Sequence, residues 1–355
     1  MLEAKLQVVA WELTRRCNLY CAHCRASAAK GPYPHELTTS QCYRVIDQIV
    51  QLGKPILILS GGEPLLRQDF FDIASYASQK GLRVALGTNG TILDSNMASR
   101  LKQVAISRVG VSLDFPQRDL QDRFRGSSGA FDAALRGIAC VRQAGLSIQI
   151  NSTITKQNVP YLDNLLSLAL EVGAAAFHPF LLVPTGRGKG LASEELSAQE
   201  HERVLNWIYD KQNQLGERIF FKPTDAPQYL RILQQRGSTA KGGHGSVNSL
   251  SRGCLAGIGF CFISHTGKVQ GCGYLDIEAG DLKQQNLSQV WQTSPLFLQL
   301  RNLSNIKGKC GVCEFKKVCG GCRARAYELN GDFLAEEPCC IYQPRAIAKA
   351  GKDQC

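Results

Sequence analysis

The chain has 355 residues, of which 44% are hydrophobic and 20% are charged, and these proportions exclude an intrinsically disordered protein. No apolar run approaches the ~18 residues of a membrane span, and the N-terminal segment lacks the pattern of a signal peptide, so we expect a cytoplasmic protein. The net charge of +11 suggests an anionic partner, although the absence of long basic runs argues against nucleic acid.

Strand-like and helix-like segments alternate from residue 7 to about residue 182. The predicted strands are 7–13, 55–60, 83–87, 108–113, 147–153 and 175–183. The predicted helices are 40–52 (capped by Thr39 or Ser40), 69–80, 95–103, 130–144, 159–172 and 193–214. Six repeats of this kind predict a parallel sheet with helices outside, either doubly wound or an open partial barrel. In such sheets, ligands bind at the carboxyl ends of the strands.

The second half of the chain has a different composition. Residues 237–253 are rich in Gly and Ser, which predicts a linker or loop. Residues 254–343 are rich in cysteines and turns, and metal clusters would supply the cross-links that apolar burial cannot. We therefore predict a core domain at 7–215, a bridging segment at 216–253, a cysteine-rich domain at 254–343 and a tail at 344–355.

The chain has 15 cysteines, and in a reducing cytosol clustered cysteines indicate metal ligands or redox groups. Cys17, Cys21 and Cys24 directly follow the first predicted strand. Three thiolates can hold a [4Fe–4S] cluster and leave one iron open to a small molecule. A zinc site with His23 or water as the fourth ligand is the alternative, and ligand softness favours the cluster.

The spacing Cys-x3-Cys-x2-Cys at residues 17–24 resembles the signature of the radical S-adenosylmethionine (SAM) superfamily. Further family landmarks follow at strand ends, among them Ser60-Gly-Gly-Glu-Pro64. The resemblance implies a partial (β/α)6 TIM-type barrel in which SAM, bound to the open iron, is cleaved to a 5′-deoxyadenosyl radical. It also implies that the Glu63 carboxylate accepts hydrogen bonds from the SAM ammonium group. The residues implied to contact SAM are His23, Gly61, Gly62, Glu63, Pro64, Asn89, Ser112, Asp114 and Asn151.

The C-terminal cysteines resemble the SPASM extension of some radical SAM enzymes, a small α+β domain with one or two auxiliary [4Fe–4S] clusters. The last gap in the run at residues 310–322 is two residues, where the extension usually has three. By this resemblance, the ligands of one cluster would be Cys254, Cys261, Cys272 and Cys322. The ligands of the other would be Cys310, Cys313, Cys319 and either Cys339 or Cys340. A pair of zinc ribbons is the alternative that spacing alone leaves open.

Several segments, including 253–265 and 319–327, further resemble the iron-coproporphyrin III decarboxylases, which convert two propionates to vinyls and yield heme b. In this family the radical removes a propionate β-hydrogen, CO2 leaves, and an acceptor takes the remaining electron. The resemblance implies a tetrapyrrole substrate and a ferredoxin- or flavodoxin-type electron donor. Among many basic candidates, we favour Arg187 and Lys189 for the propionates, and we add Arg252. His178, His244 and His265 are candidate ligands of the substrate iron.

Three other functions remain open. The chain could act in heme d1-type tetrapyrrole maturation, or it could modify a ribosomal peptide as other SPASM enzymes do. Peptide-modifying enzymes often have a recognition domain before the barrel, and the first predicted strand here already begins near residue 7, which disfavours that function. A non-catalytic carrier of heme or iron–sulfur clusters is the third alternative, and it would not cleave SAM.

Overall fold

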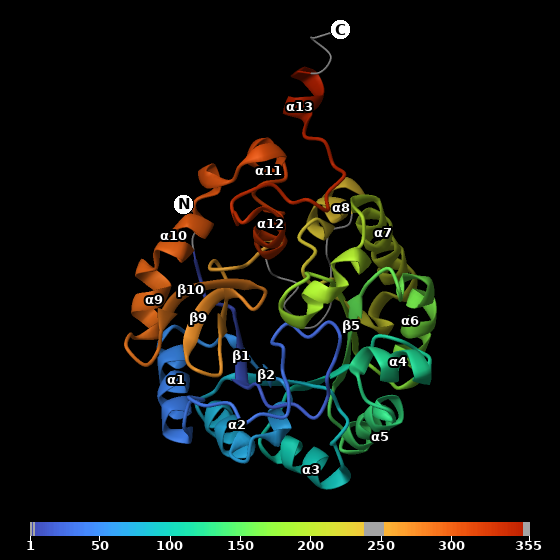
Figure 1. The fold of residues 1–355 in the computed structure, drawn as a ribbon, viewed down its shortest axis with the longest axis vertical. Helices are drawn as coiled ribbons and strands as arrows, with labels where there is room; N and C mark the ends of the chain where they lie inside the picture. The colour runs from blue at the N-terminus through green and yellow to red at the C-terminus, as the bar shows by residue number, and fades with distance from the viewer. Residues whose placement is uncertain (1, 3, 238–251, 351–355) are drawn as a thin grey trace.

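The computed structural model describes residues 2, 4–237 and 252–350, which fold around one ten-stranded sheet (Figure 1). The strand order is β10-β9-β8-β1-β2-β3-β4-β5-β6-β7. The strands of the barrel are β1 (Val8–Thr14), β2 (Ile56–Gly61), β3 (Arg83–Thr88), β4 (Arg108–Ser112), β5 (Ile148–Ile154), β6 (Ala176–Leu181) and β7 (Phe220–Phe221). All neighbours from β1 to β7 pair in parallel.

Helices follow the strands and cover one face of the sheet. They are α1 (Thr39–Gln51), α2 (Phe70–Gln79), α3 (Ser95–Gln103), α4 (Arg118–Arg125), α5 (Ala130–Gln143), α6 (Leu162–Glu171), α7 (Ala198–Leu215) and α8 (Tyr229–Gln235). Figure 1 shows them in an arc around the strands, from α1 through α3 to α6 and α7. This architecture confirms the predicted partial (β/α)6 barrel.

Burial alternates along the barrel strands because successive side chains point to opposite faces. Leu57, Val84 and Ile148 pack against the helices and are at most 2% exposed. Ile58 and Gln149 point the other way and are only half-buried. The outer face of the sheet is therefore the hydrophobic core, whereas the inner face retains access to solvent and can receive a ligand.

The predicted helices differ from the structure at a few ends. Thr38, rather than Thr39 or Ser40, caps α1, because its hydroxyl accepts from the Gln41 amide while the Gln41 side chain accepts from the Thr38 amide. The helix predicted at 193–214 begins at Ala198, after a 3-10 segment at Gly186–Glu194. Helix α4 was not predicted, since its sequence is dominated by charged residues.

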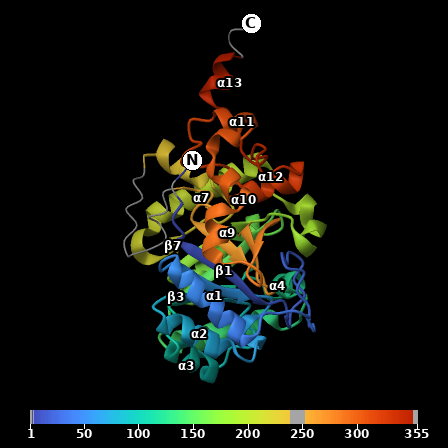
Figure 2. The same ribbon diagram turned by 90° about the vertical axis from the view of Figure 1, so that its left-hand side faces the viewer.

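The cysteine-rich region contains more regular structure than the sequence predicts. Its elements are β8 (Phe260–Ile263), β9 (Lys268–Cys272), β10 (Leu275–Asp281), α9 (Leu287–Thr293), α10 (Pro295–Arg301), α11 (Gly308–Val312), α12 (Arg323–Asn330) and α13 (Arg345–Ala350). Strand β8 pairs in parallel with β1, so this region extends the barrel sheet. Figure 2 shows α9 beside α1, where the Leu287 amide donates to the Gln48 side chain at 2.8 Å. The predicted domain bounds remain a prediction.

Most of the predicted linker, residues 238–251, lies outside the described residues, as does His244. In the part of the chain that the structure describes, no helix has both the length and the apolar character to cross a membrane.

Candidate metal centres

The first cysteine group lies on the loop that leaves β1 at the carboxyl edge of the barrel. Cys17 and Cys21 are buried and Cys24 is half-buried. The Cys17 amide donates to the Ala29 carbonyl at 2.8 Å, and the Ala22 amide donates to the Phe124 carbonyl, at the end of α4, at 2.9 Å. These bonds close the loop on itself and attach it to the barrel.

Polar hydrogens point at all three sulfur atoms of this loop. The Leu19 amide lies 3.4 Å from the Cys17 sulfur, and the Ala28 amide lies 3.3 Å from the Cys24 sulfur. The Arg125 guanidinium lies 3.8 Å from the Cys21 sulfur. Donors of this kind stabilise thiolates and tune the potential of an iron–sulfur cluster, so the loop fits such a cluster. Without iron, burial raises the pKa of Cys17 to about 11.

The glycines of the Ser60–Pro64 motif let the end of β2 press against the cysteine loop. A Cβ atom on Gly61 would lie 2.3 Å from the Thr14 carbonyl oxygen, and one on Gly62 would lie 2.5 Å from the Arg16 carbonyl oxygen. No side chain fits at either position, so glycine is required by the close approach of two backbones. Pro64 then starts a 3-10 turn at Pro64–Leu66.

Glu63 is fully buried behind this motif. Its carboxylate accepts from the Thr88 hydroxyl and the Asn89 amide, both at 2.8 Å, and from the Leu65 amide at 3.2 Å. Burial raises the pKa of Glu63 to about 7 although these bonds oppose the rise. The carboxylate thus joins the ends of β2 and β3, and its predicted contact with the SAM ammonium group remains a prediction.

The other residues implied to contact SAM gather at the same edge. His23 stacks on Phe124 with 4.5 Å between ring centroids, and burial lowers its pKa to about 4, so the imidazole is neutral. The side-chain amide of Asn89 donates to the side-chain oxygen of Asn18 at 2.9 Å, and this bond places Asn89 against the cysteine loop. Ser112 and Asn151 lie opposite each other on β4 and β5, half-buried on the inner face.

Asp114 follows β4, and its carboxylate is engaged by other groups of the protein. It is fully buried, forms an ion pair with Arg125 and accepts from the Thr153 amide at 2.8 Å. Because Arg125 reaches the Cys21 sulfur, Asp114 positions the cation that faces the first cysteine group. A direct contact with SAM remains a prediction.

In the C-terminal region, Cys310, Cys313, Cys319 and Cys340 line one pocket. The Gly321 amide lies 3.4 Å from the Cys319 sulfur, and the Glu337 amide lies 3.3 Å from the Cys310 sulfur. Four converging cysteines with amide donors match the ligand set of a [4Fe–4S] cluster.

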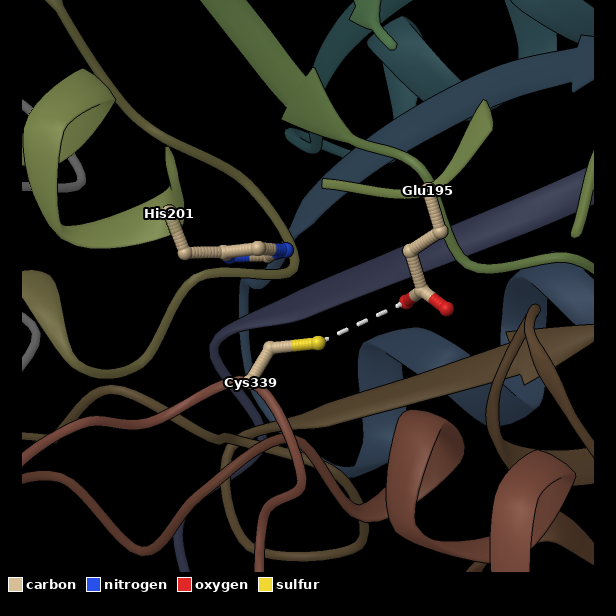
Figure 3. Close-up of side chains that lie close together, drawn as sticks. All are labelled: Glu195, His201 and Cys339. Atoms are coloured by element: carbon tan, nitrogen blue, oxygen red, sulfur yellow. Dashed lines mark hydrogen bonds between the residues drawn. The ribbon is translucent and has the colours of Figure 1, made fainter. Parts of the chain in front are cut away.

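Cys339 points away from that pocket, although it is the direct neighbour of Cys340. Its thiol lies 3.8 Å from the Glu195 carboxylate and 3.7 Å from the Leu196 carbonyl oxygen. Figure 3 shows the thiol directed at Glu195, with the buried His201 ring facing both groups. Of the two alternatives that the sequence left open, the structure therefore favours Cys340 as the fourth ligand.

The remaining cysteines divide into two kinds of environment. The Cys254 amide donates to the Cys319 carbonyl at 3.1 Å, and the Cys322 amide donates to the Glu337 carboxylate at 2.6 Å. Burial raises the pKa of Cys272 to about 12, and the nearby Cys254 adds to the rise. Cys261 is fully buried, and it lies on the opposite face of the sheet from Cys272, because Phe262 pairs with Gln270 between β8 and β9 and side chains alternate along a strand. The ligand set that the resemblance implies for this auxiliary cluster remains a prediction.

Comparisons with known proteins match both regions of the chain that contain the cysteine groups. Residues 11–169 match the family model of the radical SAM superfamily, and residues 254–323 match that of an iron-sulfur cluster-binding domain, SPASM. An AdoMet-dependent heme synthase of Methanosarcina barkeri is 46% identical over 343 residues, which cover 95% of this chain and 97% of the relative. The pre-heme d1 synthase of Dinoroseobacter shibae is 34% identical, over 94% of this chain and 85% of the relative.

The chain belongs to the radical SAM/SPASM family. It is an enzyme that binds SAM and [4Fe–4S] clusters, which confirms these predictions and argues against the zinc alternatives and a non-catalytic carrier. The fold agrees with that of Streptococcus suis SuiB bound to S-adenosylmethionine, with a TM-score of 0.75 at 16% identity, over 96% of this chain and 78% of SuiB.

Three predicted substrate-binding cations of this radical SAM enzyme have protein partners. Arg187 lies 3.6 Å above the Tyr20 ring and donates to the carbonyls of Cys21 and Ala28 at 2.8 and 3.0 Å. Arg252 donates to the carbonyls of Cys254 and Lys316 at 3.2 and 2.8 Å, and exposed Lys189 lies 3.5 Å from Glu328. Arg187 and Arg252 therefore support the two cysteine regions, and their predicted contact with the substrate remains a prediction.

Sequence reasoning missed Glu12, an acidic residue inside the apolar strand β1. Its buried carboxylate lies 2.9 Å from both Arg15 and Arg25 and 2.8 Å from His265. Burial alone would raise the pKa of Glu12, yet these partners lower it to about 2. Arg25 also donates to the Gly273 carbonyl at 3.2 Å, so this network connects the neighbour of Cys24 with the neighbour of Cys272. The sequence signal that could have identified Glu12 is a single carboxylate among the mostly apolar residues of β1.

Proposed function

We propose that this radical SAM enzyme decarboxylates two propionates of iron-coproporphyrin III to vinyl groups and so forms heme b in the cytoplasm. The observation that carries this proposal is the similarity to a heme synthase along nearly the whole of both chains, with both cysteine groups included. When bound, the cluster and SAM supply a 5′-deoxyadenosyl radical that removes a hydrogen atom. Each propionate would lose one hydrogen atom, one CO2 and one electron.

The inner face of the barrel suits a substrate of this kind. Its side chains are half-buried while the outer face is closed by helices, so a substrate bound against the inner face would meet the carboxyl ends of the strands. The residues implied to contact SAM border the same face, with Ser112 and Asn151 in register on adjacent strands. A substrate that enters here lies next to the nucleotide.

The electron that each decarboxylation releases needs an acceptor, and a contact between the two cysteine regions supports an auxiliary cluster in this role. Arg25 directly follows Cys24 and donates to the carbonyl of Gly273, which directly follows Cys272. The two cysteine regions therefore touch, and an auxiliary cluster is a suitable electron acceptor. A ferredoxin- or flavodoxin-type protein would reduce the first cluster, and the net charge of +11 favours an acidic partner of this kind.

The test is anaerobic incubation of the purified enzyme with SAM, a reductant and iron-coproporphyrin III, followed by mass spectrometry of the porphyrin. We expect two successive decreases in porphyrin mass, each equal to one CO2 plus two hydrogen atoms. One 5′-deoxyadenosine should form for each propionate converted. Cleavage of SAM without a change in porphyrin mass would contradict the substrate and direct the search to d1-type tetrapyrroles or peptides. Cys24→Ala is the matched control, because it removes one of three cluster ligands.

A further inference from the structure

A row of polar side chains crosses the inner face of the barrel at one level. Ser112 on β4 lies opposite Asn151 on β5, which lies opposite His178 on β6. The next strand continues the register, because Phe177 pairs with Phe221 and the Lys222 amide donates to the Phe177 carbonyl at 3.2 Å. Phe221 packs outward against Trp207 of α7, so Lys222 follows on the inner face beside His178.

Lys222 is a cation without a counterion. Among residues 2, 4–237 and 252–350, no carboxylate or carbonyl lies within bonding distance of its ammonium group. Burial is the sole cause that lowers the pKa of Lys222, to about 8, and at neutral pH the group is still mostly charged. Lys222 is half-buried. A charge that is partly withdrawn from water is costly unless it is paired, so this ammonium group is set up for an anion from outside the chain.

His178 next to it is also unsatisfied. Its Nε2 atom is buried and has no hydrogen-bond partner among the described residues. Burial, together with the charges of Lys222 and Arg108, holds the pKa of His178 well below its usual range. The imidazole is therefore neutral and can donate one hydrogen bond without adding a charge to the site.

The other basic residues considered for the substrate contrast with Lys222. Arg187 and Arg252 donate to backbone carbonyls around the cysteines, and Lys189 is exposed beside Glu328. Their hydrogen-bonding capacity is largely used by the protein, and they lie outside the row. Lys222 is half-buried, has no bonded partner among the described residues and continues the row beside His178, which pairs with Asn151, one of the residues implied to contact SAM.

We propose that Lys222 and His178 bind a carboxylate of the substrate inside the barrel, next to the SAM site. The ligand class is a propionate of a tetrapyrrole, and in this detail the inference rests on the proposed function. The ammonium group would pair with the carboxylate and keep it ionised, which is the form from which CO2 departs. The neutral imidazole would donate a second hydrogen bond and fix the orientation of the carboxylate.

The experiment compares Lys222→Met, Lys222→Arg and Lys211→Met in the cluster-loaded enzyme. Lys211→Met removes an ammonium group from the outer side of α7, where it pairs with Asp163. Anaerobic titration with iron-coproporphyrin III, followed by its Soret absorption, should show binding to Lys222→Met weakened by about thirtyfold or more. Lys222→Arg should recover most of the affinity, and Lys211→Met should bind as the wild type does.

Two further readouts separate binding from folding. Because Lys222→Met removes a half-buried unpaired charge, its melting temperature should equal or exceed that of the wild type, whereas a structural role would lower it. Heme b has two propionates fewer than the substrate, so the wild type should prefer iron-coproporphyrin III and Lys222→Met should lose that preference. Unchanged affinity and preference in a folded Lys222→Met variant would overturn the inference and leave the proposed function intact. A wild type that neither binds nor converts iron-coproporphyrin III would overturn both.

Discussion

The two cysteine regions of this enzyme serve the same kind of cluster but are built in different ways. Around Cys17, Cys21 and Cys24, the supporting groups come from distant parts of the barrel, including Arg125 of α4 and Arg187 after β6. Around Cys310, Cys313, Cys319 and Cys340, the amide donors come from the same short region, as with Gly321 and Glu337. The barrel therefore shapes the first site before iron binds, whereas the second depends on its metal for cross-links.

The largest expected effect is at the first site. Cys24→Ala should reduce SAM cleavage below detection while the barrel remains folded, because the barrel packing does not depend on that thiol. The measurement is 5′-deoxyadenosine formed under reducing conditions, with circular dichroism as the check on folding.

Cys42→Ala is the control for this prediction, since Cys42 is a fully buried core residue remote in sequence from both cysteine groups. It should retain SAM cleavage and lose some stability. Residual cleavage by Cys24→Ala would show that the first site is not the one that binds SAM.

The second expected effect concerns the pocket lined by Cys310, Cys313, Cys319 and Cys340. Cys340→Ser should lower the iron content by about four atoms per chain and make the region around residues 308–345 sensitive to protease, because the cross-link is lost. Cys339→Ser should retain the iron, since that thiol faces Glu195. Iron and sulfide analysis with EPR measures both, and the reverse pattern would assign the ligand to Cys339.

The third expected effect concerns the Glu12 network, which connects the two cysteine regions through Arg25. Glu12→Gln should lower the free energy of unfolding by about 3 kcal/mol at neutral pH, because the pKa of Glu12 is lowered from 4.5 to about 2 in the folded state. A depressed carboxyl pKa stabilises the fold above pH 4.5, and this contribution is lost as the pH falls from 4.5 to about 2. The difference between variant and wild type should shrink across that window in anaerobic urea unfolding. A difference independent of pH would contradict the ion-pair explanation.

The smallest effects should distinguish two neighbouring cations that the sequence could not separate. Arg187→Met should destabilise the protein by about 2 kcal/mol, since two buried carbonyls lose their donor. Lys189→Met should change the free energy of unfolding by less than about 0.5 kcal/mol, because its ion pair with Glu328 is exposed. Thermal unfolding of both variants checks this order, and equal losses would refute it.

Much of the barrel could be predicted because its signals are local. The helix at Ser95–Gln103 was predicted with its observed ends, and the six strands agree to within two residues, since alternation of apolar residues reports directly on a buried strand. Helix α4 escaped because only a few of its residues are buried, so its charged sequence has no clear apolar stripe. The pairing of β8 with β1 escaped because two strands about 250 residues apart leave no mark on each other's sequence.

The spacing of Cys17, Cys21 and Cys24, the positions of the six predicted strands and the family could all be read from the chain, because motifs and periodicity are properties of neighbouring residues. The direction of the Cys339 thiol toward Glu195, the burial of Cys261 and the pairing of Glu12 with His265 were decided by folding. Each of these depends on which way a side chain points once distant segments pack together. The same is true of Lys222, whose lack of a counterion among the described residues becomes visible only once the strands of the barrel have packed together.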